Sequence, residues 1–482
     1  MDTDPATAEP APTSRGTVRP AGGGAASRAF GALPRLDGEL VRDPCSTARA
    51  ADDYGHLVRH RPLGVLRAAS ASDIAAVLRW CAEHGIPAAA RGQGHTTYGQ
   101  AQVEGGMVLD TAALRGVRWE SASRVAVQAG ARWSDVLRAT LRRGRAPRVL
   151  TDYLGLSVGG TLSVGGFGGA SQHYGAQTDN VAEIEVVTGN GRIATCSPDQ
   201  DPELFHAALA GLGQCAVITR ASVETVPVPP SVRRFALSYP TASALAHDQR
   251  RLVADGRFAH VEGLARPAPD GGGWRYVLEA VAMPPARERP DDAALLGDLH
   301  DDREQAEIGD LPFLEFADRM APGIRGLRLT GQWYHPHPWL NLLLPDSAAD
   351  DVVGTVMAGL TPDAIGPSGV VLLYPMRRAV LRTPLLRVPD EPVVFLFALL
   401  RTATPAPGAP TAEEALDANR RSYELARERG GVRYPVGSVA MGPGDWPAHF
   451  GERWPDLVAA KAAYDPASIL APGVGVFPAP PR

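Results

Sequence analysis

Cysteine is scarce in this sequence of 482 residues, which contains only Cys45, Cys81, Cys196 and Cys215. The four lie far apart and form no C-x-x-C pair, which argues against a disulfide scaffold and against a zinc site. We therefore expect buried free thiols and no bound metal.

Long apolar runs are also missing. No stretch approaches the roughly 20 apolar residues that a membrane span requires. Residues 1–36 are rich in Pro, Ala, Gly, Thr and Ser, and they contain neither an apolar run of signal-peptide length nor a twin-arginine pair. We interpret residues 1–36 as a disordered N-terminal tail, and we expect a cytoplasmic protein with no membrane partner.

Positive charge is not concentrated anywhere along the chain. The sequence has 48 Lys and Arg against 53 Asp and Glu, a net charge of −5, and its arginines are scattered. This distribution argues against nucleic acid as a partner. We expect a small-molecule substrate as the partner of this chain. At this length, two domains or one domain with a large insertion are expected.

Glycine, by contrast, is gathered into two segments. The first, Arg91 to Gln100, has the sequence RGQGHTTYGQ and lies between apolar runs at 86–90 and 107–110. Without Cβ atoms, its backbone N–H groups can approach a phosphate closely. The spacing is neither that of the dinucleotide fingerprint nor that of a Walker loop. Its histidine, His95, would by itself more often be a structural residue.

The second segment holds seven glycines between Gly155 and Gly169. Each glycine costs about 1 kcal/mol relative to Ala in a helix, so the segment cannot be helical throughout. A flexible linker is the alternative, but Leu156, Val158 and Leu162 are interleaved with the glycines, which linkers rarely show. A second backbone cradle is the better interpretation.

The rest of the chain predicts an α+β fold. Short strands alternate with single helices over 37–228, including a helix that opens at Ser72 and ends at Gly85. The run 226–230 is rich in proline and marks a boundary. Residues 229–430 then predict one sheet with helices on one face. Strands are expected at 235–239, 258–264, 275–281, 339–344, 370–375 and 393–400, and helices at 241–255 and 412–427.

Several blocks together resemble a known family. Residues 91–100, 151–162 and 180–191 are similar to the PCMH-type FAD-binding domain of the vanillyl-alcohol oxidase superfamily, and within it to cytokinin dehydrogenases. Further matching blocks follow in order at 261–263, 333–341, 374–376, 464–466 and 469–473, so the resemblance covers most of the chain after the tail. It implies a two-part FAD-binding domain at 37–228, completed by 431–482, and a substrate domain at 229–430 with one large antiparallel sheet covered by helices.

The resemblance implies FAD as the cofactor. In the family, the histidine at the position of His95 is joined covalently to the 8α-methyl group of the flavin. Relatives with a second, cysteinyl bond carry the cysteine where this chain has residues 152–156, which include none, so a single attachment is implied. The cofactor-binding positions implied are Arg91, Gly92, Gln93, Gly94, His95, Thr96, Gln100, Ala101, Ser157, Gly159, Gly160, Ser163, Phe167, Ile218 and Tyr434.

Asp152 is the candidate catalytic base. Its neighbours Leu150, Tyr153 and Leu154 are apolar or aromatic, so desolvation would raise the basicity of the carboxylate. A turn or helix-capping Asp is the structural alternative, but the resemblance implies the role of substrate base.

Two further residues have implied roles in the substrate site. Glu262 matches a second carboxylate of the family, near the entrance of the substrate channel, and Trp333 is expected to stack on the flat ring of the substrate. A solvated strand Glu and a core Trp are the structural alternatives, and we interpret Trp339 as structural.

The sequence thus predicts an FAD-dependent enzyme that transfers hydride from a substrate carbon to flavin N5, with oxygen or a quinone-type compound as electron acceptor. The resemblance favours dehydrogenation of a secondary amine similar to N6-isoprenyladenine. Val474 stands where cytokinin dehydrogenases carry Gln, which keeps open a flavin oxidase of an alcohol, a sugar or a biosynthetic intermediate. A non-catalytic flavin-binding protein is a third alternative, disfavoured because both His95 and Asp152 are present.

Overall fold

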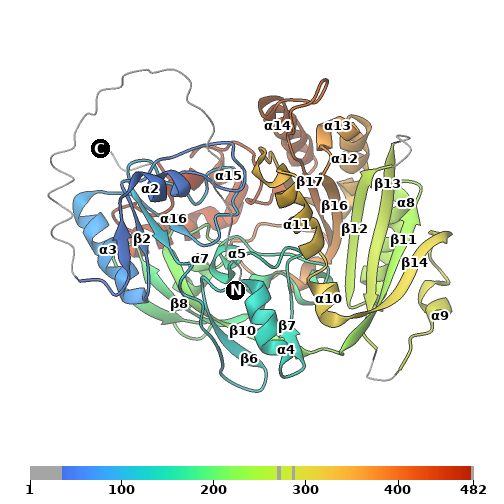
Figure 1. The fold of residues 1–482 in the computed structure, drawn as a ribbon, viewed down its shortest axis with the longest axis horizontal. Helices are drawn as coiled ribbons and strands as arrows, with labels where there is room; N and C mark the ends of the chain where they lie inside the picture. The colour runs from blue at the N-terminus through green and yellow to red at the C-terminus, as the bar shows by residue number, and fades with distance from the viewer. Residues whose placement is uncertain (1–34, 269–272, 285–287, 479–482) are drawn as a thin grey trace. The chain divides into compact units, whose positions relative to one another are not determined.

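Two sheets carry the part of the chain that precedes residue 228 (Figure 1). The computed structural model describes residues 35–268, 273–284 and 288–478, so most of the expected N-terminal tail lies outside the described residues. In the four-stranded sheet, of order β1-β2-β4-β3, the last three strands are parallel and β1 is antiparallel to β2. Its strands are β1 (Glu39–Val41), β2 (Gly64–Arg67), β4 (Met107–Asp110) and β3 (Ala88–Arg91).

The helix α3 (Ala71–His84) connects β2 to β3 and confirms the predicted helix. The Ser70 hydroxyl accepts a hydrogen bond from the Asp73 N–H, and Gly85 ends the helix with φ of 62°. These are a standard helix start and the left-handed stop that glycine adopts without strain. The helix places β3 so that the first glycine segment follows it directly.

The second sheet has six strands and is antiparallel. Its strands are β5 (Val117–Trp119), β6 (Arg124–Gln128), β7 (Arg145–Pro147), β8 (Val181–Thr188), β9 (Ile193–Cys196) and β10 (Ala216–Pro227). The helices of this part are α2 (Pro44–Ala50), α4 (Trp133–Leu141), α5 (Val158–Leu162), α6 (Ser171–Tyr174) and α7 (Pro202–Ala208). The second glycine segment therefore contains one short helix, α5, flanked by irregular backbone.

The third sheet has eight strands in the order β14-β11-β13-β12-β16-β17-β15-β18, all antiparallel. Its strands are β11 (Ser231–Tyr239), β12 (His260–Pro267), β13 (Trp274–Ala282), β14 (Asp302–Pro312), β15 (Leu340–Pro345), β16 (Val370–Arg377), β17 (Val393–Leu400) and β18 (Val432–Arg433). The six strands expected from the sequence all belong to it, which confirms the predicted fold class. The strands β14 and β18 were not predicted, because β14 has few apolar residues and β18 is two residues long.

Helices cover one face of this large sheet (Figure 1). Both α8 (Ala242–Asp255) and α14 (Ala412–Glu428) confirm predicted helices, and α12 (Asp346–Ala358) joins them on that face, where their apolar residues form the largest core. Near the other face run α10 (Phe313–Ala317) and α11 (Ala321–Leu329). The remaining helices are α9 (Asp292–Leu296), α13 (Pro362–Ile365), α15 (Trp446–Phe450) and α16 (Trp454–Tyr464).

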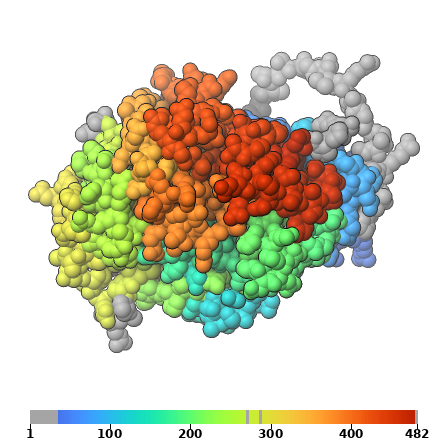
Figure 2. All heavy atoms as spheres, turned by 180° about the vertical axis from the view of Figure 1, so that it is seen from behind, coloured from blue at the N-terminus to red at the C-terminus, as the bar shows by residue number. Residues whose placement is uncertain are grey.

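The C-terminal segment returns to the first sheet. The Ala88 N–H donates to the Ile469 carbonyl, and the Ala471 N–H donates to the Ala88 carbonyl, both at 2.8 Å, which places residues 469–471 beside β3. Figure 2 shows this segment, in red, packed against green and blue surface from the earlier sheets. The boundaries proposed at residues 36, 228 and 430 stay predictions.

The cysteines differ from expectation in one respect. All four are free thiols, and Cys81, Cys196 and Cys215 are buried, but Cys45 is exposed. The expectation of burial was wrong for Cys45 because it lies in the first turn of α2, on the solvent side of that short helix. No helix among the described residues is both long and apolar enough to cross a membrane.

A buried lysine holds the returning segment in place, and its removal is expected to destabilise the fold. The Lys461 ammonium contacts the Asp465 carboxylate at 2.6 Å and donates to the Gln214 and Leu470 carbonyls. Lys461→Met would leave Asp465 buried without its cation, so we expect a loss of about 3–5 kcal/mol in the free energy of unfolding, measured by chemical denaturation.

The exposed pair formed by Arg453 and Asp456 supplies the control. Arg453→Met should change stability by less than about 1 kcal/mol. Equal effects of the two substitutions would contradict the role given to Lys461.

Candidate active site

One cavity of about 1200 Å³ lies between the two glycine segments and the open face of the large sheet. All fifteen residues predicted to bind the cofactor line it, as do Asp152 and Glu262. Residues from positions 91 to 434 thus lie around one cavity. Their individual roles stay predictions, since side chains that line a cavity need not all bind a ligand.

The first glycine segment follows β3 as a tight loop that approaches the second segment. A Cβ atom added to Gly92 would lie 2.0 Å from the Ser157 hydroxyl, and Gly94 has a φ of 66°, so glycine is required at both positions. Asp53 fixes the loop from behind, because its carboxylate accepts hydrogen bonds from the Thr96 hydroxyl at 2.7 Å and from the Gly99 N–H at 2.8 Å. No sequence motif pointed to Asp53.

The loop leaves several hydrogen-bond donors without protein partners. Within the part of the chain that the structure describes, the backbone N–H groups of residues 92–97 donate to no protein acceptor. The Nε2 atom of Gln93 is buried and likewise has no partner, although Gln93 Oε1 accepts from Arg132. Buried donors normally have acceptors. A loop of small residues with free amides fits the phosphate groups of FAD.

His95 lies among aromatic rings at the inner end of this loop. Its ring centroid is 4.0 Å from that of Tyr54, 5.0 Å from that of Tyr153 and 5.7 Å from that of Trp333. Desolvation, with smaller contributions from His337 and Arg328, lowers the pKa of His95 to about 3. The imidazole is therefore neutral at physiological pH, which is the nucleophilic form.

Trp333, which was expected to stack on the substrate, and Trp339, which was interpreted as structural, differ in position. Trp333 packs against His95 and Tyr54 and does not belong to the cavity lining, whereas Trp339 does. The predicted stacking of Trp333 on a substrate stays untested, and Trp339 is better placed for such a contact. Tyr434 packs edge-on against Phe167, and its hydroxyl accepts a hydrogen bond from the Gly166 N–H at 2.9 Å.

Asp152 belongs to a network of buried charges centred on Arg319. The Nη2 atom of Arg319 lies 2.8 Å from Asp152 and 2.6 Å from Glu262, and its Nε atom lies 2.6 Å from Glu279. One guanidinium thus joins three carboxylates. The Tyr374 hydroxyl donates a short hydrogen bond to the other oxygen of Asp152.

Further partners surround the two glutamates, which face each other across β12 and β13. Glu262 accepts from the Gly169 N–H at 2.9 Å and lies 3.1 Å from the Nε2 atom of His260. Glu279 contacts Arg234 at 2.8 Å. Two guanidinium groups therefore face three carboxylates, so this network holds one more carboxylate than guanidinium groups.

As a result, the pKa values of Asp152 and Glu262 shift in opposite directions. Desolvation and the neighbouring charge of Glu262 raise the pKa of Asp152 well above its usual range, although Arg319 opposes the shift. Burial also disfavours ionisation of Glu262, but His260 and Arg319 outweigh it and hold the pKa of Glu262 well below its usual range. Glu262 thus holds its negative charge more strongly than Asp152, and Asp152 is the better proton acceptor of the two.

The structure corrects the expected position of Glu262. We expected a carboxylate near the entrance of the channel, but Glu262 is only 3% exposed and lies inside the network. Strand alternation turns its side chain to the same face as Glu279, and Arg319 covers both. The sequence missed Arg319, Tyr374 and Glu279 as site residues; a buried Glu on each of two predicted neighbouring strands was the one available signal.

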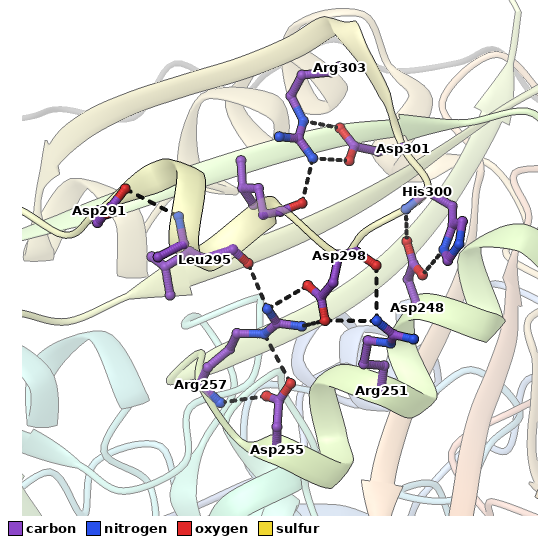
Figure 3. Close-up of polar contacts among 12 residues, drawn as sticks. Asp248, Arg251, Asp255, Arg257, Asp291, Leu295, Asp298, His300, Asp301 and Arg303 are labelled. Carbon is purple, nitrogen blue, oxygen red and sulfur yellow. Dashed lines mark hydrogen bonds and ion pairs between the residues drawn. The ribbon is translucent and has the colours of Figure 1, made fainter.

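Two groups of side chains in the described residues have the composition of a metal site. In the first, formed by His260, Glu262 and Glu279, the Arg319 guanidinium already supplies the positive charge. In the second, Asp248 is engaged by the Tyr239 hydroxyl and by the backbone and ring of His300, as Figure 3 shows for His300. In both groups, therefore, the carboxylates already have hydrogen-bond or ion-pair partners within the protein.

Comparison with known proteins identifies the family. Residues 62–197 match a family described as FAD binding domain, and residues 276–477 match one described as cytokinin dehydrogenase 1, FAD and cytokinin binding. Cytokinin dehydrogenase 4 of Oryza sativa subsp. japonica is 35% identical over 93% of this chain and 92% of its own length. The chain belongs to the cytokinin dehydrogenase family of FAD-dependent oxidoreductases.

Other relatives extend the comparison of this cytokinin dehydrogenase-like enzyme. An uncharacterized oxidoreductase, ORF5 in the fasciation locus of Rhodococcoides fascians, is 41% identical over 91% of this chain and 99% of its own length. The solved structure of 6-hydroxy-D-nicotine oxidase from Arthrobacter nicotinovorans is 21% identical and superimposes with a TM-score of 0.68, covering 91% of this chain and 97% of that one. This structure supports the shared fold of the flavoenzyme.

Loss of Arg319 should expose the repulsion within the network. In Arg319→Met three buried carboxylates lose their shared cation, so we expect a loss of about 3–5 kcal/mol in the free energy of unfolding at neutral pH. Without Arg319 the carboxyl pKa values in the folded state rise above those of the unfolded chain, so the folded state binds more protons. The deficit relative to wild type should therefore grow as pH rises from 5 to 8.

Denaturant titrations of both proteins at the two pH values check this result. Arg251→Met removes an exposed pair with Asp298 and serves as the control, with an expected change of less than about 1 kcal/mol at either pH. A deficit of Arg319→Met that shrinks with rising pH would contradict the charge network.

Proposed function

We propose that this enzyme dehydrogenates a secondary amine of the N6-isoprenyladenine class and cleaves it, after hydrolysis of the resulting imine, to adenine and an aldehyde. The observation that carries the proposal is the position of Asp152. A carboxyl of raised pKa faces a cavity that has glycine loops suited to FAD on one side and the open face of the large sheet on the other.

The residues of the two glycine segments would hold FAD, with the loop after β3 at the phosphates and His95 at the isoalloxazine. When bound, FAD would accept the hydride that leaves the substrate carbon. The neutral imidazole of His95 is suited to a covalent link with the 8α-methyl group of the flavin. Tyr434 and Phe167 form a packed wall of the same cavity.

Asp152 would take the proton from the substrate N–H as hydride leaves the adjacent carbon. Arg319 and Tyr374 hold one oxygen each, which fixes the direction of the carboxylate. Because positive charge develops on the nitrogen during the reaction, a nearby anion stabilises the transition state more than the ground state. Glu262, Arg319 and Glu279 then keep Asp152 in place without taking the proton themselves.

A second candidate keeps the flavin and exchanges the substrate for an alcohol, a sugar or a biosynthetic intermediate. Val474, which lines the cavity where cytokinin dehydrogenases carry Gln, favours this alternative. We further propose molecular oxygen or a quinone-type compound as electron acceptor, and a cytoplasmic location.

Covalent attachment of the flavin can be tested directly. We expect the flavin to remain with the denatured wild-type chain after acid precipitation and to fluoresce on a denaturing gel. His95→Ala should release FAD on denaturation, whereas His247→Ala, on the distant helix α8, should retain it. Release of the flavin from denatured wild-type protein would exclude the covalent link.

The role of Asp152 predicts a large kinetic effect. Asp152→Asn keeps the size of the side chain and loses its basicity, so the rate constant of flavin reduction should fall by about 10² to 10⁴. Stopped-flow absorption measures this rate constant. The absorption spectrum of the bound flavin in the variant checks that its cofactor site is unchanged. The matched control is Asp318→Asn, a second carboxylate of the cavity lining, which should stay within about threefold of wild type. Similar losses in both variants would remove Asp152 from the role of base.

The substrate class is tested by anaerobic mixing of the holoenzyme with isopentenyladenine or zeatin. Bleaching of the flavin absorption band supports the amine reaction. If neither compound bleaches the band while an alcohol or sugar does, the second candidate is correct.

A further inference from the structure

The face of the large sheet that lines the cavity carries its side chains in three rows. Across β12 and β13 the facing pairs are Glu262 with Glu279, Leu264 with Val277, and Arg266 with Arg275. All six side chains line the cavity. The carboxylate row belongs to the network around Asp152, the middle row is apolar, and the outer row consists of two arginines.

The distance between the first and third rows follows from strand geometry. Arg266 lies four positions after Glu262, which corresponds to about 13 Å along the strand. Leu372 on β16 faces Leu264 and extends the apolar middle row. A flat apolar group therefore fits between the charged ends of the cavity.

The two arginines are an unfavourable pair on their own, because like charges directly opposite each other on neighbouring strands repel. Arg266 is exposed and, among the described residues, has no ion-pair partner, so its donors are open to a ligand. Arg275 lies 3.6 Å from the exposed Glu307, and its Nε atom is buried without any hydrogen-bond partner. The pair thus has more donors than the protein satisfies.

The charges on the opposite wall do not neutralise this pair. Glu315 and Arg325, from α10 and α11, also line the cavity and carry opposite charges, and Asp318, between these helices, lies 3.7 Å from Arg138. The contact between Glu307 and Arg275 is long and half-exposed, so a stronger acceptor can replace it. Two guanidinium groups at one end of an apolar slot are the usual partners of a phosphate.

We propose that Arg266 and Arg275 form a subsite for a phosphate monoester at the far end of an elongated substrate. The inference rests on the proposed function, and it makes the preferred substrate an N6-isoprenyladenosine 5′-monophosphate rather than the free base. The reactive N6 end lies at Asp152, the adenine ring lies over Leu264, Val277 and Leu372, and the phosphate lies between the two arginines.

The test compares isopentenyladenine, its riboside and its riboside 5′-monophosphate in anaerobic stopped-flow reduction of the holoenzyme. The dissociation constant of the phosphate should be about 10-fold to 100-fold below that of the riboside, and the difference should shrink at high salt. In the double variant Arg266→Gln/Arg275→Gln the ratio of the two constants should fall to near one. Arg251→Gln, whose arginine pairs with Asp298 away from the cavity, should keep the wild-type ratio.

A binding measurement separates this inference from the proposed reaction. By calorimetry, adenosine 5′-monophosphate should bind the holoenzyme more tightly than adenosine, and the double variant should lose that preference. If none of the three substrates bleaches the flavin but this preference holds, the subsite stands and the proposed reaction fails. If adenosine 5′-monophosphate and adenosine bind equally tightly, the subsite is overturned, whether or not the substrates bleach the flavin.

Discussion

A single guanidinium, that of Arg319, joins three carboxylates in the interior of this protein. Removing so many charges from water is costly, and the arrangement persists only because each oxygen has a close partner. Asp152 directly precedes the second glycine segment, whereas Glu262 and Glu279 come from the large sheet. The ion pairs of Arg319 therefore link the FAD-binding part of the chain to the substrate part at the point where both face the cavity.

The same network sets the chemical character of the site. Because Glu262 lies among donors and cations, it holds its negative charge, and that charge raises the pKa of Asp152 beside it. Unequal environments thus divide a pair of carboxyl groups into one that holds its negative charge more strongly and one that is the better proton acceptor. The glycine loops have a different task, since they offer free backbone donors and little side-chain volume to the cofactor.

Local features of the structure were predictable from the sequence. The capped helix α3, the glycine loop around His95 and the six long strands of the large sheet follow from short-range patterns that a single segment contains. The charge network around Arg319 does not follow from such short-range patterns. Arg319 and Asp152 are 167 positions apart, and Arg319 lies in a short connection between two helices without any motif. The resemblance pointed to Asp152 and Glu262, but burial of Glu262 depends on Arg319, which no local pattern reveals.

The pH dependence of flavin reduction tests most directly whether this network makes Asp152 the base. The rate constant would be measured by anaerobic stopped-flow at saturating isopentenyladenine, for wild type and Asp152→Asn, from pH 5 to 9. The account predicts that the wild-type rate falls toward low pH with a midpoint well above the value of about 3.9 for an ordinary Asp, and that the Asn variant shows no such fall. A wild-type rate independent of pH, or the same fall in the Asn variant, would contradict it.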